Sequence, residues 1–391
     1  MKVAYIPMGA AGHILASLPM VGELVKKGVK VNYFAPEQFR DQVEASGVNF
    51  IPMPIVAADG PVDGGEDFLA GIPLVFLGEA CGVIDTIIPA IEADMPDAII
   101  ADALAVAGRL AAWKFNLPLI EMFTSYTANE HFAIDRFWPE YPDTNPARAK
   151  ALEIAKGLQE KFGGPLLTCT EIFEGTGDFN IVTQPKSFHP AGDTFDESKF
   201  FFAGAQIAKR ADSGTWQPPT NGKPLLYTSL GSLFNNWPQF YQMLFPVVKD
   251  LDINVLCSIG NTLKPEDLGE IPENVQVMAF TPQLEVLEHC DYFFTHAGTG
   301  SAMEALYFGV PCFCIPQMDE QIFTAKLMVE KGLACAALQK PEVTEEALRE
   351  NLKKLIEDGS FKKNAQAVAD EMHTQGGCER AAQAVIDFLN K

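Results

Sequence analysis

The pattern of apolar residues divides the start of the chain into a strand, a helix and a second strand. The run from Val3 to Pro7 is typical of a buried strand. From Ile14 to Lys27 apolar side chains recur every three or four residues, which predicts a helix that Gly28 ends. Val29 to Phe34 again has a strand pattern. This order predicts a parallel sheet with helices on both faces.

The same alternation continues through the first half of the chain. It predicts strands at Ala98–Ala101, Leu117–Phe123 and Phe179–Thr183, and a helix at Ala103–Lys114. Between Ser125 and Thr176 the pattern is irregular and rich in helical segments. Long insertions between sheet elements often shape binding sites, so we expect this region to line one.

A polar segment rich in Pro, Gly and Ser, residues 209–224, predicts a linker. After it the alternation restarts. We therefore predict an N-terminal domain (1–208), a C-terminal domain (225–376) and a last helix (377–391) that returns toward the first domain. The strands expected in the second domain are Leu225–Ser229, Ile253–Ser258, Val275–Ala279, Tyr292–Thr295 and Pro311–Ile315, with a helix at Thr344–Glu357. The fold class is α/β, with two doubly wound parallel sheets.

Length and composition narrow the class of protein. A chain of 391 residues exceeds one ordinary core, which favours two domains. A net charge of −22 argues against nucleic acid or an anionic membrane as partner. An anionic ligand would then be held by local N–H groups and dipoles. Eight cysteines without a C-x-x-C pair favour a reducing cytoplasm, and no D-x-D pattern follows a predicted strand, so we expect no metal cofactor.

Two apolar segments resemble targeting or membrane sequences. The N-terminal segment contains His13 and several glycines, which argues against a signal peptide. The longest apolar candidate, Ile72 to Ile91, is interrupted by Glu79 and Asp85. We therefore expect a protein that does not enter a membrane. We also expect a monomer or homodimer.

The most informative segment runs from Phe280 to Ala325. A strand pattern ending at Thr295 is followed by the glycine-rich break His296 to Ser301 and then by a helical pattern. A strand, glycine loop and helix present backbone N–H groups to a phosphate at the helix N-terminus. The nearby histidine and acidic residues suggest that this phosphate carries a hydroxyl-rich group, which points to a nucleotide sugar.

These residues also resemble a known signature. Phe280-Thr281-Pro282-Gln283, Thr295-His296 followed by Gly298, Ser301 and Glu304, then Gly309-Val310-Pro311 and Glu320-Gln321, are similar to the donor motif of the UDP-glycosyltransferases. The bacterial macrolide glycosyltransferase branch (glycosyltransferase family 1) is the best match, and Gly12-His13 and Leu230-Gly231-Ser232 extend it. The resemblance implies the GT-B fold, in which two Rossmann-like domains face each other across a cleft.

The resemblance also implies roles for individual residues at the donor end. Gly298, Thr299, Gly300, Ser301, His296 and Ser232 would bind the diphosphate, Phe280 would stack on uracil, and Glu320 and Gln321 would hold the sugar hydroxyls, with Asp319 a possible substitute for Glu320. Gln283 has an amide suited to a base edge. Phe280 replaces the usual tryptophan, and Thr299-Gly300 stands where plant relatives have Trp-Asn.

Two of these residues have structural alternatives. Ser301 and Glu304 have the spacing of a capping box, in which the glutamate bonds the cap backbone, and spacing alone favours that role. The resemblance instead implies that Glu304 binds the ribose hydroxyls, and the two roles need not exclude each other. Without the motif, Phe280 is as readily a core aromatic.

Two residues of the first domain form the candidate acceptor site. His13 follows the first strand and Asp102 follows a later one, so both lie at the carboxyl edge of a parallel sheet, where ligands bind. Histidine has a pKa suited to taking a proton near neutral pH, and a buried carboxylate would fix its tautomer. The pair matches the family's base and orienting acid. Taken singly, His13 is an ordinary helix N-terminal residue and Asp102 an N-cap.

We therefore predict an inverting glycosyltransferase. It would transfer a sugar, most simply glucose, from a UDP-sugar to a hydroxyl of a small apolar acceptor such as a macrolide, flavonoid or other phenol. A nucleotide-sugar epimerase on the same scaffold and a non-catalytic nucleotide-sugar-binding protein are the alternatives. The sequence does not identify the acceptor.

Overall fold

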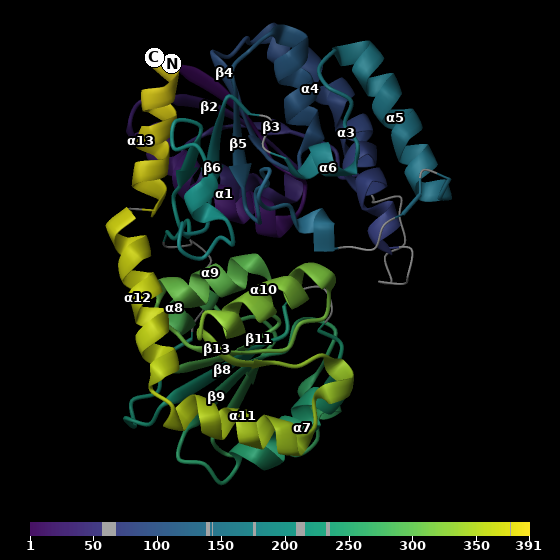
Figure 1. Ribbon diagram of the computed structural model, residues 1–391. Helices are drawn as coiled ribbons and strands as arrows, with labels where there is room; N and C mark the ends of the chain where they lie inside the picture. Colours follow the sequence, from purple (N-terminus) through teal and green to yellow (C-terminus); the bar gives the residue numbers. More distant parts are fainter. Residues whose placement is uncertain are drawn as a thin grey trace. The chain divides into compact units, whose positions relative to one another are not determined.

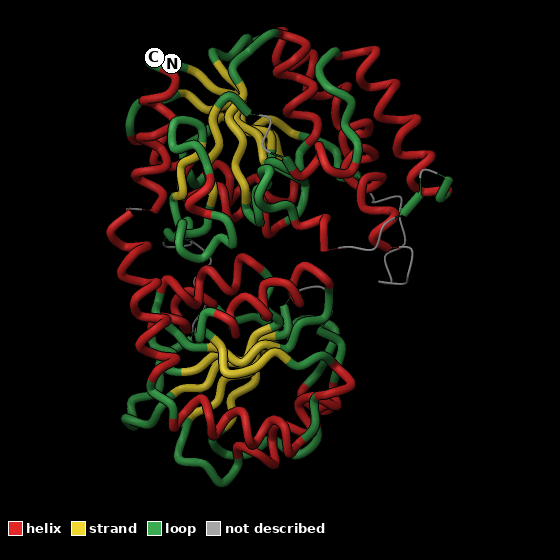
Figure 2. Tube along the Cα trace, in the orientation of Figure 1, coloured by secondary structure: helices red, strands yellow, loops and turns green. Residues whose placement is uncertain are grey.

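The computed structural model describes residues 1–56, 68–137, 141–142, 144–174, 177–208, 216–231, 235–375 and 377–391. The chain forms two compact units, the first made of Met1–Ala208 with Gln375–Lys391 and the second of Lys209–Thr374. Within each unit, helices flank a central sheet (Figures 1 and 2). Of the expected linker, residues 209–215 lie outside the described part. The remainder has no regular secondary structure.

The first unit contains a seven-stranded parallel sheet with the order β3-β2-β1-β4-β5-β6-β7. The chain moves outward from β1 to β3, then crosses to β4 on the other side of β1 and moves outward again. The direction of winding therefore reverses between β1 and β4, which is where open α/β sheets bind ligands. The strands are β1 (Lys2–Ile6), β2 (Lys30–Ala35), β3 (Asn49–Pro52), β4 (Ala98–Asp102), β5 (Leu119–Phe123), β6 (Phe179–Val182) and β7 (Phe200–Phe202).

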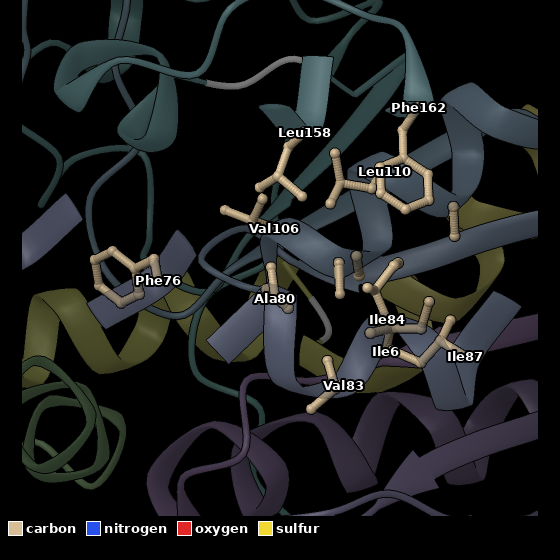
Figure 3. Packing of buried hydrophobic residues seen from close by; sticks show 14 of the residues in the cluster. Ile6, Phe76, Ala80, Val83, Ile84, Ile87, Val106, Leu110, Leu158 and Phe162 are labelled. Atoms are coloured by element: carbon tan, nitrogen blue, oxygen red, sulfur yellow. The ribbon is translucent and has the colours of Figure 1, made fainter. Parts of the chain in front are cut away.

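Successive residues of β1 serve opposite faces of this sheet, as the strand pleat requires. Ala4 and Ile6 pack against helices α3, α4 and α5, in the core shown in Figure 3, whereas Val3 and Tyr5 belong to the core beneath α1 and α13. The helices of this unit are α1 (Ala11–Lys26), α2 (Arg40–Glu44), α3 (Phe68–Ala93), α4 (Val106–Phe115), α5 (Pro146–Phe162), α6 (Cys169–Phe173) and α13 (Gly377–Leu389), with short 3₁₀ turns η1 (Glu37–Phe39), η2 (Ile134–Phe137) and η3 (Gly192–Thr194).

The last helix, α13, belongs to the first unit. Ala381, Ala382 and Val385 are fully buried in the same core as Leu24 of α1. Small side chains at these positions let the two helices approach closely.

Helix α3 is the longest helix and the sequence patterns did not predict it. By length and composition its segment Leu69–Ala93 is apolar enough to cross a membrane. In the structure it packs against α4 and α5, and Ile84 and Ile87 are buried there (Figure 3). An apolar helix of this kind is also what the core of an α/β domain requires.

The second unit repeats the winding in a six-stranded parallel sheet of order β10-β9-β8-β11-β12-β13. Its reversal lies between β8 and β11. The strands are β8 (Leu225–Ser229), β9 (Asn254–Ser258), β10 (Val275–Met278), β11 (Tyr292–Thr295), β12 (Cys312–Cys314) and β13 (Ala334–Ala337). The helices are α7 (Pro238–Val248), α8 (Gln283–Glu288), α9 (Thr299–Tyr307), α10 (Asp319–Glu330), α11 (Glu345–Glu357) and α12 (Ser360–Gln375), with 3₁₀ turns η4 (Pro265–Leu268) and η5 (Lys340–Glu342).

Candidate active site

His13 and Asp102 meet where the winding of the first sheet reverses. His13 is in the first turn of α1, and Asp102 is the last residue of β4, which pairs with β1. The His13 Nδ1 atom lies 2.7 Å from the Asp102 Oδ2 atom. Asp102 is 2% exposed, so its charge is held away from water. The two residues that the sequence placed at this edge are therefore in direct contact.

Further contacts fix the geometry of this pair. The second Asp102 oxygen, Oδ1, accepts a hydrogen bond from the Leu104 N–H at 2.9 Å. The Thr124 hydroxyl lies 3.0 Å from His13 Nδ1, and it was not predicted because it follows β5 with no motif around it. A carboxylate facing Nδ1 favours the tautomer with its proton on that nitrogen, so that Nε2 carries the lone pair.

The second candidate site lies where the winding of the second sheet reverses, at the ends of β8 and β11. Gly231 follows β8 with a φ of 84°, and His296 follows β11. A Cβ atom at Gly231 would lie 2.8 Å from His296 Nε2, and one at Gly298 would lie 2.6 Å from it. Both glycines are therefore required so that the imidazole fits between the two loops. At Gly300 a Cβ would meet nothing within 4 Å, so the protein itself does not require glycine there.

His296 is held as a neutral imidazole. Burial lowers its pKa to about 4, although a hydrogen bond with the Ser229 backbone acts in the opposite direction. Its Nδ1 atom is buried and makes no hydrogen bond within the described part of the chain. A buried polar atom without a partner costs free energy, which a ligand or a water can recover.

Helix α9 begins earlier than the sequence indicated, which corrects the capping-box expectation. Its first residue is Thr299, and Gly298 is the N-cap without a side-chain cap bond. Ser301 is thus the third residue of the helix, and Glu304 lies too far along the helix to bond the cap backbone. The first N–H groups of the helix, from Thr299 onward, lack intrahelical acceptors and bear the positive end of the helix dipole.

Glu304 and Ser301 instead face Gln283 of α8. Gln283 Nε2 donates to Glu304 Oε2 at 2.6 Å and to Ser301 Oγ at 3.2 Å. The Tyr227 hydroxyl donates to Gln283 Oε1 at 3.1 Å. The Gln283 amide, expected at a base edge, is therefore already bonded within the protein and holds the Glu304 carboxylate in place.

The residues expected at the sugar lie at the start of α10. The Thr299 hydroxyl donates to the Glu320 carboxylate, and Gln321, which is buried, accepts a hydrogen bond from the Gln317 N–H at 2.9 Å. Ser232, expected at the phosphate, lies outside the described residues. Among the residues that are described, no three His, Cys, Asp or Glu side chains gather as metal ligands do.

Phe280 is not a core residue. It is 61% exposed, so it does not pack in the core and a face of its ring is accessible. This exposure answers the alternative left open by the sequence.

Comparisons with known proteins decide the family. A family model described as the C-terminal domain of erythromycin biosynthesis protein CIII-like proteins matches residues 242–388. NDP-glycosyltransferase YjiC of Bacillus licheniformis is 33% identical over 399 residues, which cover 99% of this chain and 97% of that protein. The chain belongs to the macrolide-type NDP-sugar glycosyltransferases. Demethyllactenocin mycarosyltransferase of Streptomyces fradiae is 31% identical, over 99% of this chain and 86% of its own length.

The fold of this glycosyltransferase agrees with that assignment. The crystal structure of the calicheamicin glycosyltransferase CalG4 has a TM-score of 0.85 and 27% identity over 100% of this chain and 98% of that one. The two parallel-sheet α/β units are thus those of the GT-B fold, as expected. The protein is an enzyme that uses a nucleotide-sugar donor, and the comparisons give no support to the epimerase alternative.

Proposed function

We propose that this glycosyltransferase transfers glucose from UDP-glucose, with inversion, to a hydroxyl of a small apolar acceptor such as a macrolide or a phenol. The contact between His13 and the buried Asp102 carries the proposal. It provides a base at the carboxyl edge of the first sheet. The names of the relatives, among them an oleandomycin glycosyltransferase of Streptomyces antibioticus, support a natural-product acceptor.

In the proposed reaction, His13 Nε2 takes the proton of the acceptor hydroxyl as the oxygen attacks the anomeric carbon. The new C–O bond forms on the face opposite the bond to UDP, which breaks as the electron pair leaves with the diphosphate. An α-linked donor therefore gives a β-glycoside. Asp102 stabilises the imidazolium that forms on His13, whereas an isolated histidine has no carboxylate to stabilise this charge.

The residues of the second unit are proposed to stabilise the leaving diphosphate and to recognise the nucleoside. The first amides of α9 and the His296 imidazole would meet the growing negative charge, and stabilising charge that develops during the reaction is catalysis and not only binding. Phe280 would stack on the base and Glu304 would accept from the ribose hydroxyls. Glu320 and Gln321 would face the sugar.

We propose that no metal ion takes part. The N-terminus of α9 and neighbouring hydrogen-bond donors would stabilise the negative charge of the diphosphate. Addition of a chelator should then leave turnover unchanged. We also propose that the enzyme works in the cytoplasm as a monomer or homodimer.

The proposal is tested by incubating the purified enzyme with UDP-glucose and a panel of phenols, flavonoids and macrolides, and by determining the anomeric configuration of each product. The His13→Ala variant is measured alongside. We expect β-glucosides from the wild type and a loss of about 10²- to 10⁴-fold in the variant. Undiminished transfer by His13→Ala would show that another group is the base. Turnover only with a different nucleotide sugar would change the donor and leave the base assignment standing.

A further inference from the structure

A small pocket in the first unit lies at the loop between β1 and α1, the helix that carries the candidate base. Its volume is about 130 Å³, and it is lined by residues 8–10 after β1, residues 54–56 after β3, and Val75 and Glu79 of α3. Sites that enclose a whole drug-sized ligand have volumes of roughly 300–1,000 Å³. This pocket is therefore large enough for only one part of an acceptor.

The loop between β1 and α1 leads from the pocket to His13, whose charge acts on Glu79 in the pocket wall. The carbonyl oxygen of Ala10, a lining residue, accepts the hydrogen bond of the His13 N–H at 3.1 Å. An acceptor that reaches His13 from this side would place a neighbouring part of its skeleton in the pocket.

Among the described residues that line the pocket, Glu79 is the one with an ionisable side chain, and the other side chains are apolar. Its Oε1 atom accepts a hydrogen bond from the Gly9 N–H at 2.6 Å. A Cβ atom at Gly9 would lie only 3.0 Å from that oxygen, so glycine permits this approach. The carboxyl group is thus anchored through one oxygen, with its second oxygen, Oε2, as the remaining acceptor.

The surroundings of Glu79 disfavour its ionised carboxylate, so a hydrogen-bond partner for it would be stabilising. Burial, followed by the negative charge of Asp102, raises its pKa to about 7, while the Gly9 N–H and His13 act in the opposite direction. The group is therefore only partly ionised near neutral pH, which suits a neutral hydrogen-bond donor better than a cation. A hydroxyl donor can bond to either form.

We propose that Glu79 is a specificity-determining residue, which accepts a hydrogen bond from a second hydroxyl of the acceptor while the first hydroxyl faces His13. This inference rests on the proposed function and adds the acceptor class, which is apolar skeletons with two hydroxyl groups. It assigns a part of the acceptor site to α3, a helix that no motif in the sequence marks.

The test uses pairs of acceptors that differ only in the second hydroxyl. Dihydroxylated flavones, biphenyls and phenols are each compared with the mono-methyl ether, and kcat and KM are measured for glucoside formation. A hydrogen bond to a charged or partly charged group predicts a preference for the free diol of about ten- to a hundred-fold in kcat/KM for at least one pair. Glu79→Leu should bring that ratio close to one, mainly through KM of the diol.

Two further variants separate recognition from structure. Glu79→Gln keeps an oxygen for the Gly9 N–H but turns its NH₂ group, a donor, toward the pocket. The NH₂ group can bond the oxygen of the diol and of the ether alike, so the ratio should fall toward one although the anchor to Gly9 is kept. Glu92→Leu, at an exposed position on the same helix, should leave the ratio unchanged. Equal losses for diol and ether in Glu79→Leu would overturn the proposal, because that is the result of a purely structural role. A wild-type ratio near one for every pair would overturn it as well.

A wrong donor or reaction can be told apart from a wrong role for Glu79. If the wild type transfers glucose to none of these acceptors, the binding of each diol and its ether to wild type and Glu79→Leu is measured by calorimetry. A preference for the diol that disappears in the variant would support the role of Glu79 without the reaction, and equal binding in both proteins would overturn it.

Discussion

The imidazole of His13 and the carboxylate of Asp102 are in contact across the point where the winding of the first sheet reverses, with 2.7 Å between Nδ1 and Oδ2. One residue reaches this point from α1 and the other from the end of β4. Because β1 and β4 are neighbours in register, the contact depends on the sheet and not on a mobile loop. The geometry makes the tautomer of His13 depend on a residue 89 positions away.

Asp102→Asn should remove most activity without disturbing the fold. Since Oδ1 already accepts from the Leu104 N–H, the asparagine oxygen should take that place and its NH₂ group should face His13. The imidazole would then carry its proton on Nε2, where it cannot act as a base. We expect kcat to fall by about 10²- to 10⁴-fold. The measurement is the pH dependence of kcat/KM for glucoside formation.

The neighbouring Thr124 provides the matched control for that variant. Thr124→Val removes a hydroxyl 3.0 Å from His13 Nδ1 but leaves the carboxylate, so a loss of only a few-fold is expected. If Asp102→Asn is no worse than Thr124→Val, the carboxylate does not set the tautomer.

Phe280→Ala should weaken donor binding and leave stability unchanged. The ring is 61% exposed, so its removal opens no cavity. Stacking of an aromatic side chain on a base contributes roughly 1–3 kcal/mol, which corresponds to an increase in KM for UDP-glucose of about 5- to 150-fold. Phe280→Trp enlarges the platform and should lower KM. Equal KM values in all three proteins would mean that the base lies elsewhere.

The fold was largely predictable where periodicity was regular. The apolar spacing of α1 and the short strand patterns of the second unit led to the observed parallel sheets, because each element buries one face or both. Helix α3 was missed since apolar residues occupy most positions of Phe68–Ala93 on more than one face and hide the helical period. The edge strands β3, β7 and β13 were also missed.

The candidate site was predictable only in part. The rule that carboxyl ends of parallel strands share one edge brought His13 and Asp102 together. No such rule relates Gln283 to Glu304, since their contact depends on how α8 packs beside α9. Glu79 was visible in the sequence only as an interruption of an apolar run. Its role depends on the loop at Gly9, which only the folded chain brings to it.

Glu304→Gln tests whether this carboxylate recognises ribose. A carboxylate offers acceptors to two hydroxyls, whereas an amide offers one, so we expect UDP to bind about ten-fold more weakly. The measurement is inhibition by UDP and by its 2′-deoxy analogue. The wild type should prefer UDP, and the variant should lose that preference. Gln283→Ala, which removes the support of Glu304 together with the bonds to Ser301 and Tyr227, should weaken binding and keep part of the preference.

The buried pair of Arg109 and Glu121 should dominate the stability of the first unit. Both side chains are fully buried, with 2.5 Å between Arg109 Nε and Glu121 Oε1, and Arg109 also donates to the Ala103 carbonyl at 3.0 Å. Arg109→Met leaves the buried Glu121 carboxylate without its cationic partner, at a cost of about 3–5 kcal/mol in the free energy of unfolding. A second substitution, Glu121→Leu, should recover part of this loss. Additive losses in chemical denaturation would argue against direct coupling.

The neutral imidazole of His296, half-buried with its Nδ1 atom inside the protein, should make the second unit less stable in acid. Its pKa is about 4 in the folded protein against 6.5 for an unperturbed histidine. Between these values the unfolded chain binds a proton and the folded chain does not, so the free energy of unfolding falls as pH falls through this window. The full effect at pH 4 is about 3 kcal/mol.

Denaturation of wild type and His296→Gln between about pH 4 and 7 measures it, because other groups titrate in both proteins and cancel in the difference. The variant should lose this part of the acid sensitivity, whereas His131→Gln, at an exposed position, should retain it. Parallel curves for wild type and His296→Gln would mean that the imidazole is not buried as described, and the role of His296 as a neutral donor to the diphosphate would be wrong.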